Sequence, residues 1–293
     1  MTLYGREGSK NMLRLMETRQ NDYLTMPESV RLTHSLGDIL ENDVIVISIG
    51  SQNLDPLCRE LSALGAHGKT IVLCMKGLEI GSCRRLSQVA SEALGSSCSV
   101  AVWLGPGHVQ EFVRGIPNCM VIDSADETTK RRLVDLFSSD LIRFYYGTDL
   151  IGNEIGAASK NVIGIAAGML DGYGLGTLKG ALMSRGTREI ARLISALGGN
   201  GLSAYGLCHL GDYEATVFSQ HSQNRCFGER YARGEKYDKL AEGYYTAEAM
   251  HELSQRVDVE LPICETVYDI LYNGADARRS IDALFKRSLK NEF

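Results

Sequence analysis

The sequence predicts an α/β domain built on a parallel sheet, followed by an all-α domain. In the first half of the chain, short β-branched runs alternate with segments of helical spacing, which is typical of parallel strands joined by crossover helices. After about residue 147 no such run recurs, and the apolar residues keep helical spacing. The length of 293 residues allows two domains, which we place at residues 1–147 and 148–293.

Five short apolar runs predict the strands of the first domain. Residues 43–49 form an almost continuous β-branched run, which is typical of a strand buried on both faces of its sheet. The other four runs lie at residues 70–75, 99–104, 119–122 and 142–146. Between them, apolar residues with helical spacing predict helices near residues 54–64, 86–93 and 133–137.

The second domain is predicted to consist of helices. Ile190, Leu193, Ile194 and Leu197 recur with the spacing of one helix face, and Gly198 supplies a C-terminal stop. Five helices are expected, over residues 161–170, 189–197, 247–257, 262–272 and 280–289.

The charge balance excludes some classes of partner. Lys and Arg number 31 and Asp and Glu 36, so the net charge is −5. A mildly acidic chain lacks the basic surface that nucleic acid or an anionic membrane requires. No apolar run is long enough to span a bilayer, and the N-terminus does not resemble a signal peptide. We therefore expect a cytoplasmic protein with no nucleic-acid partner and no membrane span.

Cysteine and histidine spacing gives no sign of a metal site. None of the eight cysteines forms a C-x-x-C pair, so we expect reduced thiols rather than disulfides. The six histidines show no H-x-x-x-H spacing, so no metal is expected. The dinucleotide fingerprint G-x-G-x-x-G also occurs nowhere in the chain, which leaves a nucleotide-binding assignment weak on these grounds.

Three polar or glycine positions stand out at the ends of predicted elements. Lys76 follows the strand at 70–75, and Gly105 begins a tight turn after the strand at 99–104. Ligands of open α/β sheets bind at this carboxyl edge. Lys160 lies between two apolar stretches, which leaves a buried functional role and an ordinary solvated role equally open.

Several short motifs occur in a fixed order along the chain: Lys-Gly-Leu-Glu at 76–79, Gly-Pro at 105–106, Lys-Asn-Val-Ile at 160–163, Asp-Gly-Tyr-Gly-Leu-Gly at 171–176, Leu-Gly-Asp at 210–212 and Asn-Arg at 224–225. In this order they resemble the bacterial type of the NAD(P)-dependent glycerol-3-phosphate dehydrogenase family. The resemblance implies a Rossmann-type domain followed by a helical domain. It also implies reversible hydride transfer between NAD(P) and dihydroxyacetone phosphate, giving sn-glycerol 3-phosphate for glycerophospholipid synthesis.

The resemblance also assigns roles to individual residues. Lys160 matches the family's proton-transferring lysine, Lys76 a second lysine at the substrate, and Asp212 a carboxylate that orients the lysine or a substrate hydroxyl. A lysine can transfer this proton only if its pKa falls from about 10.4 toward neutrality, which burial and a second cation favour. The implied substrate-binding residues are Lys76, Gly105, Lys160, Asp212, Thr216, Ser222, Gln223, Asn224 and Arg225. The implied cofactor-binding residues are Arg6, Lys76, Val109, Gln223, Leu240 and Glu242, with no metal.

The sequence departs from the family at its start. It begins at residues 2–6, which match the family's second strand, so the first strand, the glycine-rich turn and the first helix are absent. Without that strand, the sheet must expose two strand edges or close up. Two interpretations remain open, a longer native protein or a damaged or repurposed copy.

Point departures affect the predicted site itself. Gln223 stands where the family has an arginine that contacts phosphate, and Gly-Pro-Gly-His-Val at 105–109 replaces the family's Gly-Pro-Ser/Thr-Phe-Ala. Arg225 could compensate for the lost charge. Arg6, after the strand at 2–6, tolerates a 2′-phosphate, so we expect NADP or NAD with a preference for NADPH or for both. The alternatives are a silent copy that binds or dimerises through its helical domain, and a related hydroxyacid dehydrogenase with another substrate. A homodimer is the expected assembly.

Overall fold

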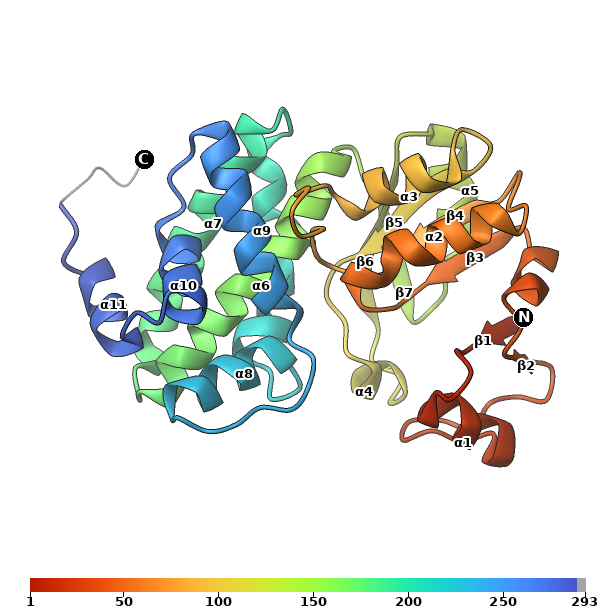
Figure 1. Cartoon of the computed structure of the whole chain (residues 1–293), viewed down its shortest axis with the longest axis horizontal. Coiled ribbons are helices and arrows are strands. Elements are labelled where there is room, and N and C mark those ends of the chain that lie inside the picture. The colour runs from red at the N-terminus through yellow and green to blue at the C-terminus, as the bar shows by residue number, and fades with distance from the viewer. Residues whose placement is uncertain (289–293) are drawn as a thin grey trace. The chain divides into compact units, whose positions relative to one another are not determined.

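The computed structural model describes residues 1–288 and divides the chain into two compact units (Figure 1). The first unit comprises Met1–Met75, Ser87–Trp103 and Gly107–Tyr146. The second comprises Lys76–Leu86, Leu104–Pro106 and the described part of Gly147–Phe293. The short segments that follow two of the strands therefore belong to the helical unit, although they precede residue 147 in the chain.

The first unit contains a five-stranded sheet in the order β3-β4-β5-β6-β7. The strands are β3 (Val44–Ile47), β4 (Thr70–Leu73), β5 (Ser99–Leu104), β6 (Asn118–Ser124) and β7 (Ile142–Tyr146). β3 pairs with β4, β4 with β5, and β6 with β7, all in parallel. The predicted combination of a parallel-sheet domain and a helical domain is thus confirmed.

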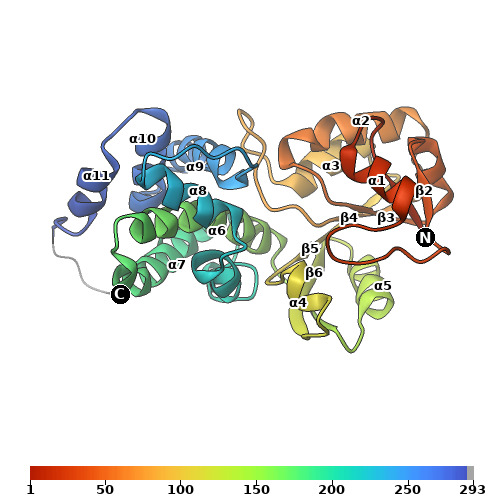
Figure 2. The same cartoon turned by 90° about the horizontal axis from the view of Figure 1, so that it is seen from below.

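Helices cover both faces of this sheet. Figure 2 shows α2 (Leu54–Ala63) and α3 (Leu86–Leu94) on one face and α5 (Glu127–Phe137) on the other. On the α5 side, the Trp103 ring lies 4.8 Å from Phe144 in an edge-to-face contact and 5.1 Å from Phe137. Aromatic pairs in this arrangement add to the energy of simple burial.

The expectation that residues 43–49 are buried on both faces is wrong. Ile45 and Ile47 are buried, but Val46 between them is 46% exposed. Val46 is in register with Val72, on the face that α5 covers. α5 packs on β6 and β7, toward the opposite edge of the sheet, so it does not cover β3.

A second, two-stranded parallel sheet joins β1 (Thr2–Tyr4) to β2 (Arg31–Thr33). It precedes the main sheet and does not merge with it. Among residues 1–288 no strand lies between β1 and β3, so the two sheets stay separate. Of the two expected outcomes, the structure therefore has open strand edges and not a closed sheet. The helix α1 (Lys10–Thr18), which sequence periodicity did not predict, connects the two short strands.

The helical unit is built around α6 (Leu150–Gly172), which is largely buried (Figure 1). Four helices pack on α6: α7 (Lys179–Ala196), α8 (Gln223–Ala232), α9 (Glu242–Val257) and α10 (Pro262–Tyr272). The last described helix is α11 (Ala277–Leu284). The predicted helix at 280–289 overlaps it, and residue 289 lies outside the described residues.

Glycines set the close approach of α6 and α8. A side-chain carbon at Gly168 would overlap the carbonyl oxygen of Arg225, and one at Gly228 would overlap that of Ile165. The two backbones are therefore nearly in contact, which only residues without a Cβ allow. The prediction of a helix over 161–170 found only the C-terminal half of α6, because Gly, Ala and Asn residues weaken the apolar pattern of the N-terminal half.

Two further features of residues 1–288 bear on the expectations from composition. All eight cysteines are free thiols, and four of them are buried. None of the described helices combines the length and the apolar character that crossing a membrane requires.

Candidate active site

α6 carries Lys160 at its centre, and the side chain is buried with a charged and a polar partner. Lys160 Nζ lies 3.0 Å from Asp212 Oδ2 and donates a hydrogen bond of 2.6 Å to Thr216 Oγ1. Asp212 comes from a short 3-10 turn, Leu210–Asp212, and Thr216 from the single π turn Glu214–Phe218. Of the two roles that the sequence left open for Lys160, burial excludes the solvated one, since the residue is only 7% exposed.

Lys76 reaches the same carboxylate from another segment of the helical unit. Its Nζ lies 2.6 Å from Asp212 Oδ2 and 2.7 Å from the carbonyl oxygen of Gly105. Gly105 has a φ of 123°, a backbone conformation that other residues rarely adopt, and it thereby presents this carbonyl to the lysine. Asn161 donates from Nδ2 to the backbone oxygen of Lys76 at 3.2 Å, which fixes the segment against α6.

The cluster of Lys76, Lys160, Asp212 and Thr216 therefore has two cations for one carboxylate. The pKa of Lys160 is lowered to about 8, mainly by burial and also by the neighbouring Lys76, while Asp212 acts in the opposite direction. A lysine with this pKa can both donate and accept a proton near neutral pH. This arrangement fits a group that exchanges a proton with a bound substrate.

The N-terminus of α8 lies one helical turn along α6 from Lys160. A side chain at Gly164 would come within 2.8 Å of Thr216 Cγ2 and 3.4 Å of Asn224 Cβ, so the glycine lets both residues approach. Asn224 is buried, and its Oδ1 accepts a hydrogen bond of 2.8 Å from the backbone nitrogen of Gly243 in α9. Asn224 is thus held in a fixed orientation beside the lysine cluster.

The two residues that precede Asn224 differ in burial: Ser222 is buried and Gln223 is exposed. Ser222 is buried and caps α8 by accepting from the backbone nitrogen of Arg225 at 3.3 Å. Gln223 accepts from the Tyr237 hydroxyl at 2.6 Å through its Oε1.

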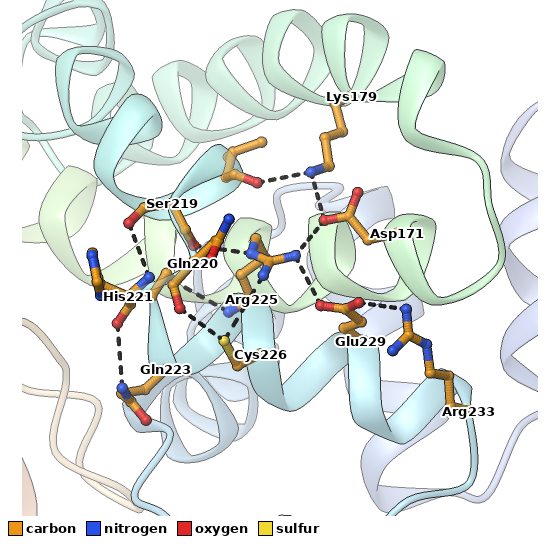
Figure 3. A network of polar contacts seen from close by, with 12 residues as sticks. Asp171, Lys179, Ser219, Gln220, His221, Gln223, Arg225, Cys226, Glu229 and Arg233 are labelled. Atoms are coloured by element: carbon orange, nitrogen blue, oxygen red, sulfur yellow. Dashed lines mark hydrogen bonds and ion pairs between the residues drawn. The ribbon is translucent and has the colours of Figure 1, made fainter.

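Arg225 does not join the lysine cluster. Its guanidinium contacts Asp171 at 2.7 Å and Glu229 at 3.0 Å, and it donates to the carbonyl of Ser219 at 2.9 Å (Figure 3). These contacts place Arg225 in a network of ion pairs, and its part in phosphate binding stays a prediction.

The predicted cofactor residues are divided between the two units. Arg6 and Val109 belong to the first unit, where both are exposed. Gln223, the exposed Leu240 and Glu242 belong to the helical unit, where Glu242 begins α9.

Sequence reasoning missed two contributors to the site. Asn161 donates a hydrogen bond to the backbone carbonyl of Lys76. Gly164, which has no side chain, leaves space for Thr216 and Asn224 to pack against α6. Asn161 is adjacent to Lys160, which could have marked it, whereas the role of Gly164 depends on neighbours that are far away in sequence.

These features define a protein class: a parallel-sheet unit of Rossmann type joined to a helical unit in which a buried lysine and a partly buried lysine share one carboxylate. Family models with the descriptions "NAD-dependent glycerol-3-phosphate dehydrogenase N-terminus" and "C-terminus" match residues 1–130 and 149–282. The chain belongs to the NAD-dependent glycerol-3-phosphate dehydrogenase family.

Individual relatives agree with this assignment. Glycerol-3-phosphate dehydrogenase [NAD(P)+] of Pelodictyon phaeoclathratiforme is 36% identical over 92% of this chain and 84% of the relative. The enzyme of the same name from Desulfitobacterium hafniense is 35% identical over 100% and 86%. The solved structure of the glycerol-3-phosphate dehydrogenase of Coxiella burnetii has a TM-score of 0.90 at 28% identity, covering 98% of this chain and 91% of that one.

Proposed function

We propose that this chain interconverts dihydroxyacetone phosphate and sn-glycerol 3-phosphate by hydride transfer with NAD(P), in the supply of glycerophospholipid precursors. One observation carries the proposal. In a member of this family, a buried lysine with a pKa of about 8 shares one carboxylate oxygen with a second lysine. The relatives that share most of the chain are named for this activity.

The donor set of the cluster fits a nicotinamide cofactor. Its lysines, carboxylate and hydroxyl can bind polar groups and move a proton, but none of them can carry a hydride. A bound nicotinamide supplies the hydride in one direction and accepts it in the other. The residues that we propose to hold this cofactor are Arg6, Lys76, Val109, Gln223, Leu240 and Glu242. Arg6 follows β1, where an arginine accommodates a 2′-phosphate, and this favours NADP as well as NAD.

The proposed proton step follows from the contacts of Lys160. As the ketone carbon gains a hydride, its oxygen becomes basic, and the Lys160 ammonium donates the proton that completes the alcohol. In the reverse direction, the neutral Lys160 amine removes the hydroxyl proton as the hydride leaves. Asp212 and Thr216 orient the nitrogen, and the Lys76 ammonium stabilises negative charge on the substrate oxygen.

We place the substrate phosphate at the start of α8. The Oδ1 of Asn224 is occupied by Gly243, which leaves the Nδ2 donor for a phosphate oxygen. Ser222 and Gln223 precede it, and the first backbone N–H groups of a helix attract anions. Arg225 has an indirect role here, because it holds the Ser219 carbonyl of the preceding loop.

The proposal also covers organisation and setting. Residues 1–147 serve cofactor binding and residues 148–293 serve substrate binding and catalysis, with Lys76 and Gly105 contributed from the first segment. Eight free thiols fit the reducing cytoplasm. The assembly is proposed to be a homodimer formed through the helical unit, which light scattering would test.

The decisive experiment follows NADPH and NADH absorbance in the presence of the purified full chain and dihydroxyacetone phosphate. We expect oxidation of the cofactor with dihydroxyacetone phosphate and little with dihydroxyacetone, because the phosphate supplies binding energy. An absence of turnover with both cofactors, although circular dichroism shows a folded chain, would overturn the proposed activity.

A further inference from the structure

His209 lies three residues before Asp212 and is completely buried. Its Nδ1 is 2.8 Å from the carbonyl oxygen of Gly156 in α6, and its Nε2 is 2.7 Å from the Tyr213 hydroxyl. The two rings also meet edge to face, with centroids 4.8 Å apart. The imidazole thus joins the segment that carries Asp212 to the helix that carries Lys160.

The direction of both hydrogen bonds follows from chemistry. The Gly156 carbonyl can only accept, so His209 Nδ1 carries the proton. The pKa of His209 is lowered to about 4, mainly by burial and also by Lys160, while the bond to Gly156 and the charge of Asp212 act in the opposite direction. The ring is therefore neutral, its Nε2 carries no proton, and the Tyr213 hydroxyl must donate. The Thr187 hydroxyl also contacts that of Tyr213.

The hydrogen bonds of His209 fix the backbone near both Lys160 and Asp212, which form the ion pair. Gly156 lies four residues before Lys160, so its carbonyl belongs to the helical turn that ends at the lysine. The backbone carbonyl of His209 accepts from the Asp212 backbone nitrogen at 3.0 Å. A side chain at Gly156 would come within 3.0 Å of His209 Cβ, so the glycine makes room for the ring.

We propose that His209 and Tyr213 are a positioning pair that sets the separation of Lys160 from Asp212 and, through it, the protonation of Lys160. Asp212 lies in a three-residue turn, which has no helix of its own to hold it. Loss of the pair would let Asp212 move from Lys160 Nζ. Because Asp212 raises the pKa of Lys160, the lysine would then lose its proton at lower pH.

The test compares pH profiles of kcat for ketone reduction, and this readout rests on the proposed function. In Tyr213→Phe and His209→Ala we expect kcat to fall about 10-fold to 100-fold with KM changed less than threefold. We also expect the alkaline limb to move to lower pH. His209→Asn keeps a donor near the Nδ1 position and should recover part of kcat. Tyr231→Phe is the control, because it removes a partly buried tyrosine hydrogen bond, to the Ile270 carbonyl at 2.9 Å, outside the lysine cluster.

The pH profile of kcat decides whether His209 and Tyr213 position Lys160 and Asp212 or only stabilise the fold. If Tyr213→Phe and His209→Ala lower only the melting temperature and keep the wild-type pH profile, as expected for Tyr231→Phe, the pair is structural and the inference fails. If Ala does not fold at position 209, Tyr213→Phe decides alone. An NMR titration of the Lys160 side-chain nitrogen, assigned with Lys160→Ala, reads the same shift without turnover. It separates failure of this inference from failure of the proposed activity.

Discussion

Two clusters of charged side chains lie along α6. They contain similar residue types, but we propose a catalytic role for the first and a structural role for the second. The first is the lysine cluster of Lys76, Lys160, Asp212 and Thr216. The second is the network of Asp171, Lys179, Arg225 and Glu229, shown in Figure 3. Lys160 and Asp171 are eleven residues apart on the helix, which corresponds to about 16 Å along its axis.

The clusters differ in charge balance. The lysine cluster sets one carboxylate against two cations, and its buried lysine has a lowered pKa. The network joins the carboxylates of Asp171 and Glu229 to Lys179 and Arg225, and the half-exposed Arg233 also pairs with Glu229 at 2.6 Å. Although burial opposes it, the bond to Asp171 raises the pKa of Arg225, which stays ionised. The lysine cluster can therefore exchange a proton near neutral pH, whereas the ion pairs of the network join α6, α7 and α8.

Removing a lysine from the first cluster should lower kcat, whereas removing one from the second should lower the melting temperature. Lys160→Ala should lower kcat by about a thousandfold, because it removes the proton donor, while the chain remains folded. Lys179→Ala removes a nitrogen that bonds Asp171 at 2.6 Å and the Val217 carbonyl at 3.0 Å. It should keep kcat within a few-fold and lower the melting temperature. Steady-state kinetics and thermal unfolding of both variants test this pair. Substantial turnover by Lys160→Ala would contradict the contrast.

Breaking the network should be the largest change in stability. Asp171→Ala leaves Lys179 and Arg225 buried with one carboxylate fewer, and it should lower the free energy of unfolding by about 3–5 kcal/mol. Urea denaturation gives this value, with Asp171→Asn as the control that keeps the shape and some hydrogen bonds. A loss below about 1 kcal/mol would show that the network contributes as little as an exposed ion pair.

The pKa of Lys160 predicts opposite pH limbs for the two directions of the reaction. Ketone reduction needs the protonated lysine, so its kcat should fall above about pH 8, approaching tenfold per pH unit. Alcohol oxidation needs the neutral amine, so its kcat should rise toward pH 8 and then level off. Initial rates in both directions in a common buffer series provide the measurement. The same limb in both directions would indicate another titrating group.

Restoring charge at the start of α8 should give the smallest effect. Gln223→Arg adds a cation beside Asn224, and charge-assisted hydrogen bonds are about twice as strong as neutral ones. We expect KM for dihydroxyacetone phosphate to fall about fivefold to tenfold with little change in kcat. Gln220→Arg places the same charge in the neighbouring loop and serves as the control (Figure 3). An unchanged KM in Gln223→Arg would mean that phosphate is bound elsewhere.

Local pattern predicted the elements well where the pattern was strong. The strand at 99–104 and the helix at 262–272 have their predicted bounds, because each combines an apolar pattern with a clear start or stop. No helix was predicted at α8, whose polar residues include Gln, Asn, Glu and two Arg. Its stability comes from contact with α6 rather than from helix propensity.

The residues predicted for the site also fall into two groups, those that meet in the lysine cluster and those that do not. Lys160, Lys76 and Asp212 were identified as residue types at motif positions, and the structure brings all three together. Arg225 was a candidate for phosphate binding by the same reasoning, yet its contacts are with Asp171 and Glu229. Glu229 lies four residues after Arg225 in α8, but Asp171 and Asp212 come from other elements, so the local pattern alone does not separate the two fates.

By itself, the sequence determined the order of strands and helices and the presence of an unusual lysine, because periodicity and flanking residues act over a few positions. Only the tertiary structure decided which charges meet. Lys76 and Asp212 are 136 residues apart, and their contact exists because glycines let distant segments approach α6. The protonation of Lys160 follows from that meeting, since burial and neighbouring charge are properties of the folded chain.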